Sequence, residues 1–397
     1  MKSLKPALLL GLCLTGTAQE FPKTSPQTKL NEIQILGTHN SYAQSVDPQL
    51  MEYVEPILAR LTAERAKRMT SEQVLSYEEE HPNRVTFTEA LSYRHPDLKT
   101  QLNAGMRGLE LDLNPDPQGG LFLNPAGYRF LRSKGASDLA PADQTGLDQP
   151  GLKVLHIADL DFRSHCPTFK GCLTQIREWS DANPKHVPLF ILLEAKSQAL
   201  PIFPNPTQLA PFDKQAFDRI DEEILSVFRR ERLIVPDDVR GSHETLKKAV
   251  LAQNWPSLEQ SRGKVLFLMI TANGTASTAP YLEGHPSLKG RVAFLRASPQ
   301  DDHAAFLMFD NAILRGQEIQ GYVQSGYLVR TRADIETLEA KTNDKSRANA
   351  AFASGAQIVS TDFFRPGNVY GTSYVVLLPD GGVARCNPVL KRACSTK

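Results

Sequence analysis

Short apolar runs alternate with segments of helical periodicity along most of this chain, and that alternation limits the folds open to it. Eight such runs are bounded by turn residues, one of them with two candidate positions: 33–36, 108–113, 153–157, 188–193, 264–270, 292–295 or 305–309, 327–330 and 357–360. Helical periodicity fills most of the gaps between them, for example in 168–183, 213–231, 242–253 and 334–353. Strands that alternate with helices indicate parallel βα units.

About eight such units in one chain predict an α/β fold of the (β/α)₈ TIM-barrel type. An open, doubly wound sheet is the alternative, but it usually carries a glycine-rich phosphate loop after its first strand, and no such loop is present here. Because no internal repeat or clear linker divides the sequence, we expect residues 19–397 to form a single domain.

Two long segments interrupt the alternation, 47–99 after the first predicted strand and 114–151 after the second. We expect long loops here, and loops that follow barrel strands lie on the catalytic face. Both segments could therefore cover a site. The second is rich in Pro, Gly and Asp and is equally compatible with a surface decoration.

Residues 1–18 have the pattern of a secretory signal peptide. Lys2 and Lys5 precede a short apolar run, 7–14, and small residues follow it at 16–18. The run is too short to cross a bilayer, which takes about 20 residues, and no later segment is long and apolar enough. We therefore expect a secreted or periplasmic protein without a transmembrane segment.

The cysteines agree with an oxidising compartment. Cys13 lies within the signal-like segment, and the other four form two sequence-local pairs. The simplest of the three possible connectivities joins Cys166 to Cys172 and Cys386 to Cys394. A zinc site is the rival interpretation, but no Cys-x-x-Cys spacing occurs.

The charges exclude one class of partner. The chain has 45 Lys and Arg against 44 Asp and Glu, a formal net charge of +1. A nucleic-acid-binding domain is usually strongly basic, so we expect no nucleic-acid partner.

Acidic residues occur within a predicted barrel strand, where buried apolar side chains are expected. In the second predicted strand, Glu110 and Asp112 are two residues apart and therefore share one face. Two carboxylates on one face repel each other unless a cation lies between them, and ligands that are all oxygen favour Ca²⁺ or Mg²⁺. A solvated edge strand is the alternative.

Other polar residues follow the neighbouring predicted strands. His39 and Asn40 come after the first strand, His156 ends the third, and Glu194 and Lys196 end the long apolar run of the fourth. Such ends converge in a barrel, so we expect two histidines beside an oxygen-lined metal site. Histidines divide general base and general acid work, and a hard cation neutralises phosphate. Phosphodiester cleavage is the reaction that uses both.

Four motifs carry a resemblance to a known family: Leu36-Gly37-Thr38-His39-Asn40-Ser41-Tyr42, Gly108-Leu109-Glu110-Leu111-Asp112, Val154-Leu155-His156 and Leu193-Glu194-Ala195-Lys196. Together they resemble the catalytic X region of phosphoinositide-specific phospholipase C. The chain is most similar to the secreted, Ca²⁺-dependent phosphatidylinositol-specific phospholipase C proteins of bacteria and fungi. Runs 328–334 and 354–362 are similar to that group as well, so the resemblance covers most of the chain.

The resemblance implies a site and a reaction. The positions that match the family's ligands for one catalytic Ca²⁺, with Mg²⁺ less favoured, are Asn40, Glu110, Asp112 and Glu194. His39 matches the histidine beside the phosphate and the attacking hydroxyl, and His156 matches the general acid. The implied products are a cyclic inositol phosphate and diacylglycerol. Lys196 is a weaker candidate for a substrate contact, at the phosphate. Arg330, Arg332 and Asp362 are weaker candidates still, and each could instead form a salt bridge at the end of the barrel.

Other interpretations remain open at this point. A glycerophosphodiester phosphodiesterase or a phospholipase D of similar barrel type also uses paired histidines with acidic metal ligands. A non-catalytic lipid-binding barrel is disfavoured because both histidines and all the implied ligands are intact. For the phospholipase C we expect a monomer that meets its phospholipid peripherally, at a membrane surface.

Overall fold

The computed structural model describes residue 25 and residues 27–81, 85–197, 199–272 and 275–390. The signal peptide predicted at residues 1–18 and Cys394 lie outside the described residues. Among the described helices, none combines the length and apolar character that a bilayer crossing requires.

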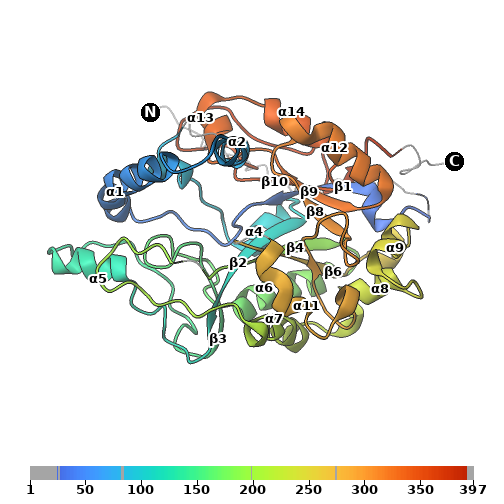
Figure 1. The fold of residues 1–397 in the computed structure, drawn as a ribbon, viewed down its shortest axis with the longest axis horizontal. Coiled ribbons are helices and arrows are strands. Elements are labelled where there is room, and N and C mark those ends of the chain that lie inside the picture. The colour runs from blue at the N-terminus through green and yellow to red at the C-terminus, as the bar shows by residue number, and fades with distance from the viewer. Residues whose placement is uncertain (1–24, 26, 82–84, 198, 273–274, 391–397) are drawn as a thin grey trace, which may run out of the picture.

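Within the described chain, parallel strands pair in a ring, which confirms the predicted barrel (Figure 1). In ring order the strands are β1 (Ile33–Thr38), β2 (Gly108–Asp116), β4 (Leu189–Ala195), β6 (Val265–Thr271), β7 (Phe294–Leu295), β8 (Phe306–Met308), β9 (Leu328–Arg332) and β10 (Ile358–Thr361). β10 pairs with β1, and a single parallel bridge, Arg296 to Phe306, joins the β7 side to β8. Between β7 and β8 the ring is therefore closed by an isolated bridge rather than by a strand ladder.

The assignment of run 153–157 to a barrel strand was wrong. Its first part is β3 (Gly151–Val154), which pairs antiparallel with the outer half of β2, from Leu113 opposite Val154 to Asp116 opposite Gly151. Both candidate positions for the sixth run, 292–295 and 305–309, contain barrel strands instead. A short apolar run carries no information about strand direction, so the sequence could not separate these cases.

Two further short strands flank the ring. β5 (Leu233–Ile234) runs beside the start of β6, and β11 (Arg385–Cys386) pairs antiparallel with β1. Neither contributes to the strand ends described below.

Helices cover the outside of the ring (Figure 1). They are α6 (Phe169–Ala182), α7 (Lys214–Val227), α8 (Pro236–Arg240), α9 (Leu246–Leu251), α10 (Leu258–Ser261), α11 (Ala279–Leu282), α12 (Ala312–Ser325), α13 (Leu338–Thr342) and α14 (Ser346–Ala353). Thr168 begins α6 as predicted, because its side chain accepts a hydrogen bond from the Gly171 backbone N–H. The predicted helix 334–353 is divided into α13 and α14 by Asn343, whose φ is +54°.

The segment after β1 is folded rather than a long loop. It contains α1 (Pro48–Ala66), α2 (Ser71–Glu80), α3 (Phe87–Ala90) and α4 (Leu98–Asn103). The segment after β2 contains α5 (Ala126–Ser133), and α1 and α5 lie at the same side of the molecule, on the left of Figure 1. The Tyr128 hydroxyl on α5 donates to the Asp47 carboxylate that caps α1, at 3.2 Å, so the two insertions are in contact.

The cysteine pattern is confirmed where it is described. Cys166 and Cys172 form a disulfide with their Cα atoms 5.2 Å apart. Cys386 is disulfide-bonded as well, and the partner predicted for it, Cys394, lies outside the described residues.

β1 and β2 meet at two glycines directly below the predicted site. Gly37 is opposite Gly108 in the ladder, and a Cβ atom added to Gly37 would lie 2.7 Å from the Gly108 Cα and carbonyl oxygen. That distance is too short for non-bonded atoms, so a side chain at Gly37 would push the two strands apart. His39 follows Gly37 by two residues and would move with β1.

We therefore predict that Gly37→Ala destabilises the protein by about 1–3 kcal/mol, the usual cost of forcing extra atoms into a packed interior. Urea unfolding followed by circular dichroism measures this change. Gly321→Ala is the matched control, because Gly321 is exposed on α12 with no atom near its Cβ position. That control should be neutral or up to about 1 kcal/mol more stable. Equal stability of the two variants would contradict the close approach of β1 and β2.

Candidate active site

Three carboxylates from two neighbouring strands converge at the carboxyl end of the ring. Glu110 and Asp112 share one face of β2, and Asp112 lies opposite Glu194 in the β2–β4 ladder. One oxygen of each residue lies within 4.8 Å of the others. Glu110 and Asp112 are buried, and Glu194 is half-buried. The predicted acidic cluster therefore exists, and it faces the inside of the barrel rather than solvent.

Asn40 offers a fourth oxygen. It occupies the turn after β1 with φ of +44°, a conformation that asparagine tolerates better than most residues. Its side-chain amide nitrogen donates to the Tyr93 hydroxyl at 2.6 Å, which leaves the amide oxygen buried without a hydrogen-bond partner. Asp112 has no hydrogen bond to either carboxylate oxygen within the described chain, although Oδ2 is ion-paired with Lys196 at 3.2 Å. Unpartnered buried oxygens are suited to a hard cation such as Ca²⁺.

Two cationic side chains contact these carboxylates. Lys196 Nζ lies 2.9 Å from Glu194 and 3.2 Å from Asp112, and Arg330 donates to Glu110 at 2.9 Å. Arg330 also forms an ion pair with Asp310. The sequence suggested substrate contacts for Lys196 and Arg330. Within the described chain Lys196 contacts the acidic cluster, and Arg330 contacts Glu110 and Asp310. That either residue contacts substrate stays a prediction.

The pKa values of all three acids differ from their ordinary values. Burial raises the pKa of Asp112 to about 6, against the opposing effect of Lys196. Burial likewise raises the pKa of Glu110, although Arg330 opposes it. For Glu194, burial acts upward but the charge and hydrogen bond of Lys196 outweigh it, so the pKa is lowered. Removing a cation from this cluster would favour protonation of the acids.

His39 is held by a buried carboxylate. Its Nδ1 lies 3.1 Å from an oxygen of Asp362, the residue that follows β10, and Arg332 at the end of β9 holds the other oxygen at 3.1 Å. A second histidine, His95, donates from Nε2 to the His39 carbonyl at 2.8 Å. Burial and the charge of Arg332 lower the pKa of His39. The imidazole is therefore neutral near pH 7, with Nδ1 directed at Asp362.

Burial disfavours the charged form of Asp362, but three neighbours outweigh it. The charge and hydrogen bond of His39, the hydrogen bond of His95 and the charge of Arg332 lower the pKa of Asp362 far below its usual range. The carboxylate thus remains ionised and keeps the His39 ring in one orientation.

His156 is held by a buried carboxylate in a similar way. It follows β3, where its Nδ1 lies 2.9 Å from the buried Asp161 carboxylate and its backbone N–H donates to the Asp161 carbonyl at 3.1 Å. The side chains of His39 and His156 are 17% and 18% exposed, enough for one edge of each ring to meet a substrate. The β2–β3 ladder, in which Leu113 pairs with Val154, brings the turn that carries His156 beside Asp112. The Ser41 N–H donates to the Glu110 carbonyl at 3.0 Å, which brings the turn that carries His39 beside Glu110.

Sequence reasoning missed the residues that orient the others. Asp362 was expected only as a weak substrate contact or a barrel-end salt bridge; its salt bridge with Arg332 is present, but its contact with His39 was not predicted. Asp161 was not singled out, although its spacing of five residues from His156 permits a tight turn. Tyr93 and His95 lie in the first insertion, where no periodic pattern pointed to the site.

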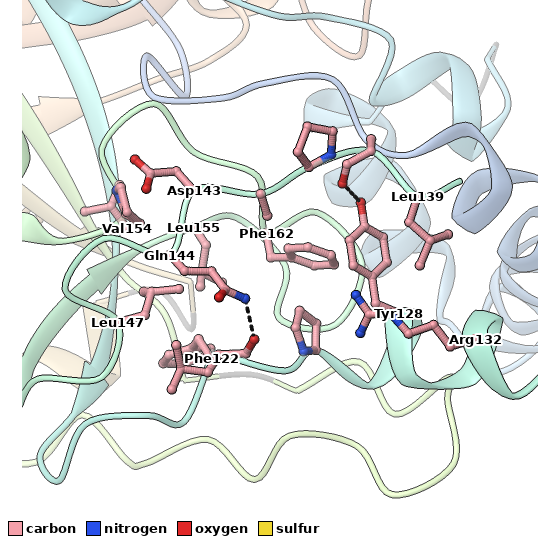
Figure 2. Close-up of a pocket in the computed structure, with 16 residues that line it drawn as sticks. Phe122, Tyr128, Arg132, Leu139, Asp143, Gln144, Leu147, Val154, Leu155 and Phe162 are labelled. Carbon is pink, nitrogen blue, oxygen red and sulfur yellow. Dashed lines mark hydrogen bonds between the residues drawn. The ribbon is translucent and has the colours of Figure 1, made fainter. Parts of the chain in front are cut away.

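A cleft and a separate cavity border this region. The cleft, about 860 Å³, runs between α1 and the segment after β10 and reaches Tyr93 and Asp362. The cavity, about 200 Å³, lies within the second insertion and is drawn in Figure 2. Its apolar lining includes Leu155 and Phe162, which directly adjoin His156 and Asp161, but none of the candidate site residues. The cavity therefore lies behind the turn that carries His156, and the candidate site residues do not line it.

Comparisons with known proteins agree with this geometry. The family model described as "Phosphoinositide phospholipase C, Ca2+-dependent" matches residues 28–388. Comparison with curated protein sequences gives no match.

Two solved structures of similar fold are described as calcium-dependent phospholipase C enzymes. A calcium-dependent phosphoinositol-specific phospholipase C from Pseudomonas sp. is 14% identical, with a TM-score of 0.51 over 92% of this chain and 98% of that one. A Ca²⁺-dependent phosphatidylinositol-specific phospholipase C from Streptomyces antibioticus is 19% identical, with a TM-score of 0.51 over 87% and 98%. At these identities the structures support the barrel fold, and the family model goes further, because it covers nearly the whole described chain. The chain belongs to the Ca²⁺-dependent phosphoinositide phospholipase C family.

Proposed function

We propose that this enzyme cleaves the phosphodiester bond of phosphatidylinositol-type lipids and releases diacylglycerol and a cyclic inositol phosphate. The observation that carries the proposal is the arrangement of one oxygen-lined acidic cluster near two histidines, each with Nδ1 against a buried carboxylate. The names of the similar solved enzymes support the inositol-lipid substrate.

The residues proposed to hold one Ca²⁺ are Asn40, Glu110, Asp112 and Glu194. Their donors are all oxygens, and the Asn40 amide oxygen, which is buried without a hydrogen-bond partner, fits a hard cation. When bound, the ion would supply positive charge that holds and neutralises the substrate phosphate. Mg²⁺ is less favoured because it demands near-ideal octahedral geometry.

We assign His39 to the attacking side of the reaction. A neutral imidazole whose Nδ1 faces Asp362 can accept the proton of a neighbouring inositol hydroxyl at Nε2. The hydroxyl oxygen then bonds to phosphorus, which closes the cyclic phosphate. Asp362 keeps the ring oriented and stabilises the positive charge that it gains.

We assign His156 to the leaving side. Its Nε2 would give a proton to the diacylglycerol oxygen as the phosphorus–oxygen bond breaks, while Asp161 holds Nδ1. Because one histidine gains a proton and the other loses one, the net protonation of the pair is unchanged after cyclisation.

The setting of the reaction is proposed as well. The signal-like pattern at residues 1–18 and the disulfide between Cys166 and Cys172 support a secreted or periplasmic enzyme. We propose a monomer that meets its phospholipid peripherally, at a membrane surface.

The metal requirement and the identity of the product can be tested in one experiment. Phosphorus NMR of phosphatidylinositol vesicles should give a cyclic inositol phosphate signal with Ca²⁺, no conversion after chelation, and more recovery with Ca²⁺ than with Mg²⁺. Full activity after exhaustive chelation would contradict the metal site. A non-cyclic phosphate monoester as the first product would point to the glycerophosphodiesterase or phospholipase D type of reaction.

The second prediction concerns the leaving-group histidine. His156→Ala should lower kcat by about 10²–10⁴, the usual contribution of a general acid, and a substrate with a more acidic leaving group should recover much of the loss. Asp161→Asn should show a smaller loss in the same direction. His243→Ala, in the turn between α8 and α9, is the control and should retain activity. An equal loss with both kinds of leaving group would rule out the general-acid role.

A further inference from the structure

Lys196 occupies an unusual position for a residue expected to contact substrate. It follows β4, and its ammonium group bridges Glu194 at 2.9 Å and Asp112 at 3.2 Å. These are two of the proposed Ca²⁺ ligands. The Lys196 side chain is 17% exposed, so it can leave the cluster toward the open face of the barrel.

The other cation of the cluster differs in both respects. Arg330 is 3% exposed and is held from two sides, by Glu110 and by Asp310. One of its two partners, Asp310, is not a proposed metal ligand, so Arg330 keeps an anchor for which the metal does not compete. Lys196 has a flexible four-carbon stem, and its ion pairs within the described chain are with the proposed ligands alone.

We propose that Lys196 is the internal counter-ion of the metal-free site, and that Ca²⁺ displaces it from Asp112 and Glu194 toward the substrate phosphate. The proposal rests on the proposed Ca²⁺ site. It adds a role for the lysine that contacts two of the proposed ligands.

Electrostatics requires the exchange. An ammonium group and a divalent cation that share the same carboxylates repel each other strongly in a buried, weakly screened site. Lys196 must therefore release its contacts when Ca²⁺ binds, and the phosphate of a bound lipid is the nearest new anion that the proposed function provides. Metal and phosphate binding are then coupled, and each raises the affinity for the other.

Calorimetric Ca²⁺ titration of the purified protein tests the first half of the proposal. Lys196→Met removes the competing cation but keeps a stem of similar length. We expect it to bind Ca²⁺ about tenfold to a hundredfold more tightly than the unmodified protein. The metal-free variant should also melt at a lower temperature, because the three carboxylates then repel each other without compensation, and Ca²⁺ should raise its Tm by more.

Two further variants make the result specific. Lys214→Met is the matched control, since Lys214 pairs with Asp218 at 2.6 Å on the surface of α7, and its Ca²⁺ affinity should equal that of the unmodified protein. Lys196→Arg keeps the positive charge and should not tighten Ca²⁺ binding. Tighter binding by Lys196→Arg would overturn the proposal, as would unchanged or weaker binding by Lys196→Met.

Glycerol 2-phosphate serves as the probe for the second half. In the presence of saturating Ca²⁺, the unmodified protein should bind it more tightly than Lys196→Met does. Equal affinity would overturn the transfer of Lys196 to phosphate. If the unmodified protein binds no Ca²⁺ at all, the proposed metal site fails together with the lysine exchange. If both proteins bind Ca²⁺ equally, only the exchange fails.

Discussion

Repulsion among three carboxylates governs how the catalytic end of this barrel is built. Glu110, Asp112 and Glu194 lie within 4.8 Å of one another in a largely buried space, where water screens charge poorly. Without a cation they would favour protonation or separation. Burial raises the pKa values of Asp112 and Glu110, and the neighbouring carboxylates add to that effect. The strand ladder fixes their backbones, so compensation must come from side chains or from a bound metal.

A second layer of contacts fixes the orientation of the groups proposed to act. Tyr93 directs the amide of Asn40, Asp362 and Asp161 each hold one histidine nitrogen, and Arg332 keeps Asp362 ionised. Several of these residues come from outside the strand ends. The first insertion, which contributes Tyr93 and His95, therefore belongs to the site as much as the barrel does.

Sequence reasoning went furthest where a physical pattern repeats. The alternation of strands and helices predicted the barrel, and the two-residue spacing of Glu110 and Asp112 predicted a shared face. The direction of β3 could not be predicted, because the run that contains it resembles a barrel strand in sequence. The orienting contacts could not be predicted either. Asp362 meets His39 because β10 pairs with β1, and Tyr93 meets Asn40 because the first insertion returns to the end of β1. The contacts of Lys196 with the acidic cluster depend on side-chain geometry that no linear pattern contains.

The antiparallel return of β3 along β2 has a consequence for how this enzyme can vary. His156 is separated from Asp112 by more than forty residues, yet its height above the acidic cluster is set by the pairing of Leu113 with Val154. Residues added or removed at the far end of that hairpin lengthen or shorten an arm that points away from the ring. The number of residues between Asp112 and His156 can therefore change without moving the imidazole.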